Sequence, residues 1–229
     1  MNKIAALFLS LFFFLLGCST GNDNEQLFDA IRNRQDDAFK EILQTGNVDL
    51  EPPRQKFRVN KPLAYAAAYG NLEMVKLLVE RGADLDGETA YGDVPIMEAL
   101  ERGNDVEIAK YLIIKGADVN KPNDFGVSSF IGLCGGDDLD LVKLALEHGG
   151  EIDERYVSKI DSGGKKNYSA LQTAVADDKP EVLKLLLDRG GDPYLEVSPG
   201  MNSFDLAKTK QHDRILKILE SYSAKLKNN

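Results

Sequence analysis

Few side chains of this sequence could carry out acid–base or metal chemistry. The two histidines, His148 and His212, lie far apart in the chain, and we expect both to be ordinary surface residues. Asp137, Asp138 and Asp140 in the stretch GGDDLD suggest calcium, but the Asp-x-Asp-x-Asp-Gly spacing with a distal glutamate is absent. A solvated acidic loop explains these aspartates better. We therefore predict no catalytic residue, no metal site and no cofactor.

A thiol and a glycine-rich basic stretch also fall short of a catalytic motif. SGGKK at 162–166 does not match G-x-x-x-x-G-K-[ST], and no strand leads into it, so we do not expect a phosphate-binding loop. Cys134 lies among small and apolar residues, where a buried thiol acts as a small hydrophobe and not as a nucleophile. A thiol- or metal-dependent hydrolase is the less favoured alternative, which metal analysis and Cys134→Ala would test.

The composition indicates a folded, acidic protein. The chain has 229 residues, enough for one or two domains, and 43% of them are hydrophobic against 28% charged. Lysine and arginine number 28 and aspartate and glutamate 37, for a net charge of −9. This charge repels nucleic acid, so we expect no nucleic-acid partner.

The N-terminus has the pattern of a secretory signal. Lys3 precedes an uncharged run at 4–16, and these 13 residues would span about 20 Å as a helix. A bilayer core is about 30 Å thick, so a signal peptide is favoured over a membrane span.

The residues Leu15-Leu16-Gly17-Cys18 that end this run resemble the bacterial lipobox. The resemblance implies a signal peptide at 1–17, cleavage before Cys18 and a lipid on its sulfur, followed by a short linker to residue 24. Buried acyl chains would then anchor the protein to a membrane without a spanning helix. Ser19 resembles the residue that directs such lipoproteins to the periplasmic face of the outer membrane.

The rest of the chain repeats with a period near 33 residues. Similar stretches occupy 61–86, 94–120, 128–153 and 169–194. One equivalent position recurs with spacings of 33, 34, 41 and 33, and it is held by Pro62, Pro95, Ser129, Ala170 and Ser203. A period of this length predicts stacked supersecondary units, each too thin to bury both its faces alone.

Each repeat has the signals of two helices followed by a turn. Proline at 62 and 95 suits a first helical position, and Ser128, Ser169 and Asn202 suit N-caps. Small residues such as Ala66, Ala67 and Ala174 would let the first helix lie close to the second. The glycines that follow the second helices suit left-handed C′ positions, and they are Gly82, Gly116, Gly149 and Gly190.

These motifs resemble the ankyrin repeat, whose pattern runs T-P-L-H-x-A-A, then G-H-L-E-V-V-K-L-L-L, then G-A-D-V-N. The match is closest at 61–86 and weakest at 128–153, where Gly132, Gly135 and Gly136 interrupt it. The resemblance implies an all-α fold, an α-solenoid of about six helix-turn-helix units over 25–222 with a tail at 223–229. We place the units at about 25–50, 59–88, 91–120, 125–153, 166–195 and 199–222, the outer two as polar caps.

Two stretches, 51–60 and 154–168, break the period, and insertions in repeat arrays often lie on the binding face. In ankyrin-like proteins the turn tips and the exposed ends of the first helices line a concave binding face. Carried over by position, this predicts a partner-binding surface of Arg58, Tyr69, Tyr91, Asp93, Glu101, Arg102, Asp124, Phe125, Lys165, Lys166, Tyr168 and Asp177.

The resemblance therefore implies a protein–protein interaction module and not an enzyme. Within that class, two roles in the bacterial envelope stay open. One is an immunity protein that binds a delivered toxin, and the other is an envelope scaffold or stress-protective factor.

Overall fold

The computed structural model describes residues 20–52, 61–155, 168–196 and 200–227. These residues form helices and connecting turns, with one isolated bridge between Pro122 and Ser128. The chain divides into two compact units, one ending at Asp49 and the other beginning at Leu50. The all-α fold of helix-turn-helix units is confirmed. The predicted signal peptide and Cys18 lie outside the described residues.

The described residues of the first unit form one helical pair, α2 (Thr20–Arg32) and α3 (Asp36–Thr45). Leu27 and Ile31 of α2 and Phe39 of α3 are fully buried. Helix α2 begins before residue 25, so residues 20–24, predicted as part of a linker, belong to the helix.

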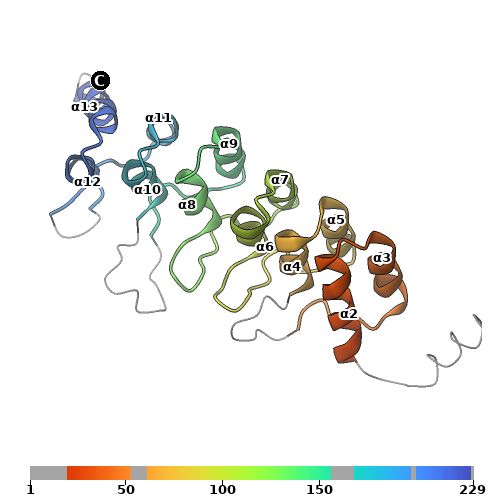
Figure 1. Ribbon diagram of the computed structural model, residues 1–229. Coiled ribbons are helices and arrows are strands. Elements are labelled where there is room, and N and C mark those ends of the chain that lie inside the picture. Colours follow the sequence, from red (N-terminus) through yellow and green to blue (C-terminus); the bar gives the residue numbers. More distant parts are fainter. Residues whose placement is uncertain (1–19, 53–60, 156–167, 197–199, 228–229) are drawn as a thin grey trace, which may run out of the picture. The chain divides into compact units, whose positions relative to one another are not determined.

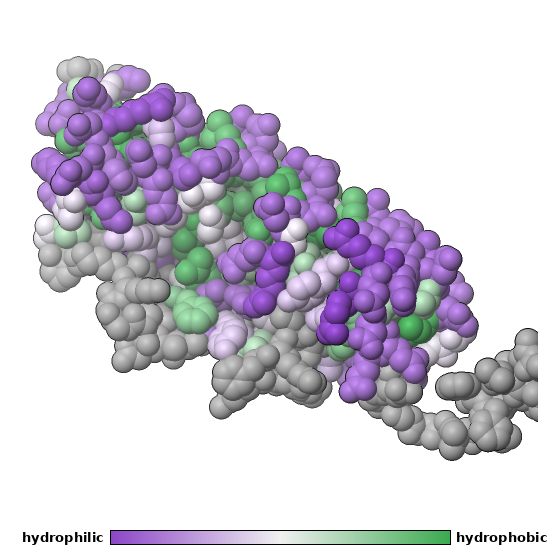
Figure 2. All heavy atoms as spheres, in the orientation of Figure 1, coloured by the Kyte–Doolittle hydropathy of each residue, from purple (hydrophilic) through white to green (hydrophobic). Residues whose placement is uncertain are grey.

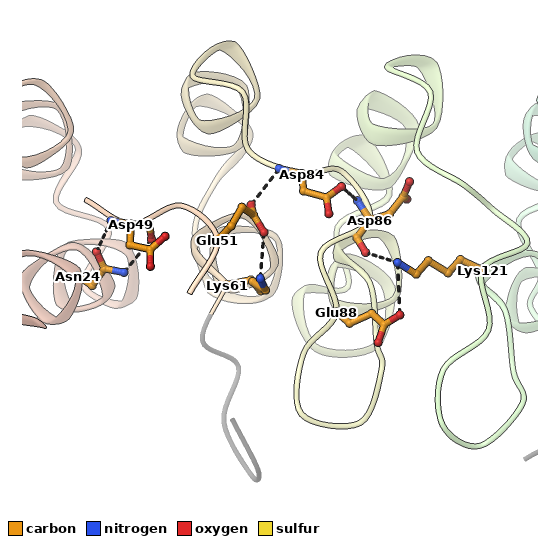
Figure 3. A network of polar contacts seen from close by, with 8 residues as sticks. All are labelled: Asn24, Asp49, Glu51, Lys61, Asp84, Asp86, Glu88 and Lys121. Atoms are coloured by element: carbon orange, nitrogen blue, oxygen red, sulfur yellow. Dashed lines mark hydrogen bonds and ion pairs between the residues drawn. The ribbon is translucent and has the colours of Figure 1, made fainter. Parts of the chain in front are cut away.

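Polar contacts give a physical reason for this earlier start. Asn24 donates to the carbonyl of Asp49 at 2.8 Å and accepts from its amide at 2.9 Å (Figure 3). Asp23 accepts from the amide of Asn47 at 2.9 Å. The first turn of α2 therefore holds the segment that follows α3.

Where the structure describes the second unit, it forms five helical pairs. Figure 1 shows the first helices of these pairs in one row and the second helices in another, with loops extending beyond the first row. The pairs are α4 (Pro62–Tyr69) with α5 (Leu72–Glu80), α6 (Pro95–Glu98) and its extension η1 (Ala99–Gly103) with α7 (Val106–Ile114), α8 (Ser129–Cys134) with α9 (Leu139–Glu147), α10 (Ala170–Ala176) with α11 (Pro180–Asp188), and α12 (Ser203–Lys210) with α13 (Asp213–Lys227).

Local signals in the sequence set these helix ends. Pro62 and Pro95 are first helical residues, and the side chains of Ser128, Ser169 and Asn202 cap α8, α10 and α12 as predicted. Such a cap is worth about 1 kcal/mol. The predicted left-handed glycines after the second helices have φ between +82° and +95°, and they are Gly82, Gly116, Gly149 and Gly190.

Helix α6 departs from the plain α-helix that its sequence predicts, because it continues into a π-helical turn, η1. The amide of Asn104 donates to the carbonyl of Ala99, five residues back. The second helix begins eleven residues after the first in this pair (Pro95 to Val106), against ten in the α4 pair (Pro62 to Leu72). The spacing of 34 residues from Pro95 to Ser129 therefore contains one residue more than the spacing of 33 from Pro62 to Pro95, and the π turn accommodates this extra residue.

Hydrogen bonds from the backbone of one repeat to a side chain of the preceding one link the turns of the second unit. The first link, at 2.9 Å between Glu51 and the amide of Asp84, is visible in Figure 3, and the second measures 2.8 Å. Two lysines reinforce these links. Lys61 pairs with Glu51, and Lys121 pairs with Glu88 and donates to the carbonyl of Asp86. In the four links, the side chain of Glu51 accepts from the amide of Asp84, Asp86 from Asp118, Asn120 from Glu151, and Asp153 from Asp192.

The last helix is also longer than predicted. Helix α13 runs to Lys227, so most of the predicted tail at 223–229 is helical. The hydroxyl groups of Ser223 and Tyr194 form a hydrogen bond of 2.6 Å, which ties the extension to the preceding repeat.

Candidate partner-binding surface

A buried carboxylate lies where α6 meets its π turn. Glu98 is only 1% exposed, and its Oε2 pairs with Nε of Arg102 at 2.6 Å. Neither carboxylate oxygen has a hydrogen-bond partner of good geometry among the described residues. Burial raises the pKa of Glu98 to about 7, and the charges of Asp93 and Glu101 add to the shift. Arg102 and the Thr89 hydroxyl act in the opposite direction.

Polar side chains from neighbouring repeats surround this carboxylate. Asn123 Nδ2 donates to Asp93 Oδ1 at 2.8 Å, and both residues are buried. Tyr69, at the end of α4, lies beside Arg102 and raises the pKa of its guanidinium, after the larger effect of Glu98. We call this set the Glu98 cluster, and its members are Tyr69, Thr89, Asp93, Glu98, Glu101, Arg102 and Asn123.

The π turn explains how Glu101 and Arg102 reach their positions. A Cβ on Gly103 would lie 2.6 Å from the carbonyl oxygen of Ala67, so η1 approaches the backbone of α4 more closely than any side chain allows. Asn104 then takes φ of +46° and ends the turn. Glu101 and Arg102 stay exposed while Glu98, one turn earlier, is buried.

Two rings flank the cluster on adjacent loops. The rings of Tyr91 and Phe125 lie 6.0 Å apart between centroids, and Phe125 is 42% exposed. The amide of Asp124 donates to the carbonyl of Tyr91 at 2.8 Å, where Gly92 has φ of +81°. A side chain at Gly92 would meet the Asp124 backbone at 2.9 Å. These two loops are therefore held in close contact.

The structure brings seven of the predicted surface residues into the cluster or its flanking loops. These are Tyr69, Tyr91, Asp93, Glu101, Arg102, Asp124 and Phe125. Tyr168 is half-buried before α10, and Asp177 is exposed at the end of α10. Arg58, Lys165 and Lys166 lie outside the described residues.

Asp93 needs a correction, because the sequence places it on an accessible surface. Asp93 is 9% exposed and accepts a hydrogen bond from Asn123, so its main role is to link two loops. Glu98 and Asn123 were missed altogether. The signal that could have found Glu98 is the 34-residue spacing, which marks an extra residue immediately after it.

The candidate chemistry considered from sequence finds little support. Cys134 is fully buried, and burial raises the pKa of its thiol, which disfavours the reactive thiolate. Asp138 caps α9, while Asp137 and Asp140 pair with lysines. Among the described residues, no group of three or more histidine, cysteine, aspartate or glutamate side chains is arranged to hold a metal ion.

The two histidines have different environments. His148 is exposed at the end of α9, as expected. His212 is half-buried and its Nδ1 lies 2.9 Å from the carbonyl oxygen of Val175 in the preceding repeat. The expectation of a solvated residue is therefore wrong for His212, which links two repeats.

On the face that Figure 2 shows, hydrophilic side chains cover most of the described second unit, and hydrophobic ones appear in smaller areas between them. Within the described part of the chain, no helix combines the length and hydrophobicity needed to cross a bilayer.

Comparison with known proteins agrees with the helical pairs. A family model for ankyrin repeats in three copies matches residues 27–123 and 96–197. The chain belongs to the ankyrin-repeat family. Ankyrin repeats bind protein partners and typically serve as non-enzymatic interaction scaffolds.

Two solved structures share this fold. An ankyrin repeat protein, EF0377, is 29% identical with a TM-score of 0.72, over 90% of this chain and 100% of that one. A chain in the solved complex of the predatory endopeptidase Bd0816 from Bdellovibrio bacteriovorus with immunity protein Bd3460 is 21% identical, with a TM-score of 0.69 over 86% of this chain and 97% of that one.

Among curated proteins, the ankyrin repeat and SAM domain-containing protein 6 of Mus musculus is 36% identical over 124 residues. This match covers 48% of the present chain and 14% of the mouse protein. The chain spans 6% of another leading relative, the ankyrin repeat and KH domain-containing protein mask-1 of Caenorhabditis elegans.

Proposed function

We propose that this protein is a lipid-anchored binding protein of the bacterial envelope, which recognises one partner protein through the Glu98 cluster and its flanking rings. The observation that carries the proposal is that seven residues of the predicted surface lie in the Glu98 cluster or its flanking loops. Tyrosine and arginine are common among the strongest contacts of protein interfaces, where phenylalanine is also enriched. Tyr69, Arg102 and Phe125 are exposed there and are positioned by the fold.

The partner we favour is an enzyme delivered to or held in the envelope, which the protein would neutralise as an immunity protein. The similarity to a chain of the endopeptidase–immunity complex supports this role by fold alone, since the identity is 21%. The lipobox-like residues before Cys18 and the following Ser19 support an anchor on the periplasmic face of the outer membrane. An envelope scaffold would use the same surface with a different partner.

Affinity capture of the full chain from envelope extract, with mass spectrometry and a binding measurement for each captured protein, tests the binding function. We expect one partner whose affinity falls about tenfold for Phe125→Ala, as for a residue central to an interface. Ile114→Ala is the matched control, because Ile114 is 60% exposed on α7, in the other row of helices. Equal retention of the partner by both variants would contradict the proposed surface.

The anchor has its own test. Cells expressing the wild-type chain should incorporate labelled palmitate into it, and Cys18→Ala should abolish the incorporation and release the protein from the membrane fraction. Unchanged labelling of Cys18→Ala would refute lipidation at this residue while leaving the binding surface unaffected.

A further inference from the structure

The Glu98 cluster points to the chemistry of the partner. We infer that it receives a cationic side chain, arginine or lysine, which the partner protein presents to Glu101 and the buried Glu98 carboxylate. This inference rests on the proposed function and deepens it, because it assigns the complementary group.

The balance of charges is the first argument. Beyond the effect of burial, the charges of Asp93 and Glu101 raise the pKa of Glu98, and that of Asp93 also raises the pKa of Glu101, so the three carboxylates act on one small region. The guanidinium of Arg102 acts in the opposite direction on both glutamates. Partial burial raises the pKa of Glu101, with Asp93 adding to the effect. Burial strengthens such interactions because water screens them less. The cluster thus carries excess negative charge, which an incoming cation would neutralise.

The second argument is a buried carboxylate with few donors, which are Arg102 and the Thr89 hydroxyl. Glu98 is 99% buried, and its single ion pair to a described residue goes from Oε2 to Arg102. Its Oε1 is buried and has no hydrogen-bond partner of good geometry among the described residues. A buried charged oxygen left in this state is costly, so a donor supplied by a partner would be favoured.

The third argument concerns access. The Arg102 side chain that pairs with Glu98 is itself 44% exposed, so the ion pair borders on solvent. Glu101 is exposed beside it, and Tyr69 presents a ring that is 39% exposed. Tyr69 lies beside Arg102, and the face of an exposed ring can bind a further cation. The described residues are not arranged to hold a metal ion, which favours an organic cation.

Short blocked peptides test this inference without the natural partner. The full chain in non-ionic detergent is titrated with acetyl-Gly-Arg-Gly-amide, acetyl-Gly-Lys-Gly-amide and the neutral acetyl-Gly-Gln-Gly-amide, and binding is read from saturation-transfer NMR of the peptides. We expect saturable binding of the two cationic peptides with a Kd on the order of millimolar, and no saturable binding of the neutral one. The ratio of the two cationic affinities distinguishes arginine from lysine.

Matched variants locate the binding. Glu101→Gln should weaken the cationic peptides about three- to fivefold, as expected for loss of one partly exposed charge. Glu147→Gln makes the same chemical change at an exposed position on α9 and should leave the affinity unchanged. Equal binding of the neutral peptide, no binding of any peptide, or equal weakening by both variants would overturn the inference.

The outcomes separate this inference from the proposed function. A captured partner that loses affinity with Phe125→Ala, but not with Glu101→Gln, would leave the function intact and refute the cationic contact. Peptide binding without any captured partner would support the cation site and count against the function.

Discussion

The first two helical pairs of the second unit begin alike and end differently. Both first helices start at a proline, but α4 ends regularly at Tyr69 while α6 passes into the π turn η1. At the fourth helical residue, α4 buries Tyr65 and α6 buries Glu98. In the regular pair, the first helix is buried from Pro62 to Ala68 and carries no charged residue. In the α6 pair, the first helix continues into the π turn and places charged side chains next to the loops.

This difference suggests a division of roles within one repeated design. An apolar helix of the standard length serves mainly to stack against its neighbours. A helix with one extra residue and a buried ion pair is less favourable for stability, since π turns are rare and often occur at functional sites. We therefore expect substitutions in the α6 pair to reveal a cost in stability that the α4 pair does not have.

Removing the Glu98 charge should give the largest effect. The pKa of Glu98 is raised from 4.5 to about 7 in the folded protein, so the folded state binds more protons than the unfolded state between these values. Wild-type stability should therefore fall relative to Glu98→Gln as pH rises from about 4.5 to above 7, by up to about 3 kcal/mol. Urea unfolding of both proteins across this range measures the difference.

Glu147→Gln serves as the control, because Glu147 is exposed on α9. Its free energy of unfolding should track that of the wild type at each pH. If the free energy of unfolding of Glu98→Gln also tracked that of the wild type, ionisation of the buried carboxylate would not reduce stability. The contrast between the two pairs would then lose its energetic basis.

The repeats were predictable from sequence because their signals are local. Prolines, cap residues and glycines act within one turn, so Pro62, Ser128 and Gly82 occupy the expected conformations. Glu98 was not predictable in the same way. A glutamate is usually exposed, and a one-residue lengthening can enter a loop as easily as a helix, so only the tertiary contact with α4 decides its place.

Adding a methyl group where η1 lies close to α4 should have the next largest effect on stability. Gly103→Ala puts a Cβ 2.6 Å from the carbonyl oxygen of Ala67, and backbone on both sides resists a shift, so we expect destabilisation of about 1–3 kcal/mol. Gly132→Ala adds a methyl group within α8 where no atom lies within 4 Å, and it should stabilise by about 0.5–1 kcal/mol. Urea midpoints that moved in the same direction for both variants would be inconsistent with a close approach at Gly103.

The proline start that α4 and α6 share can be extended to α8. Ser129 is the first residue of α8, its hydroxyl is buried without a hydrogen bond, and Ser128 before it is extended with ψ of 163°, as a proline requires. Ser129→Pro should therefore stabilise by about 0.4–1 kcal/mol. Ser203→Pro should not, because the Ser203 amide donates to the carbonyl of Pro193 at 3.2 Å. Thermal unfolding of both variants checks this smallest difference, and a gain for Ser203→Pro would contradict it.

The affinity of the captured partner for Arg102→Ala tests most directly whether the irregular pair is the recognition site. Arg189→Ala is the control, because Arg189 is an exposed arginine at the end of α11. We predict a loss of about tenfold or more for Arg102→Ala and less than about twofold for Arg189→Ala. Equal affinities of the two variants would contradict the account.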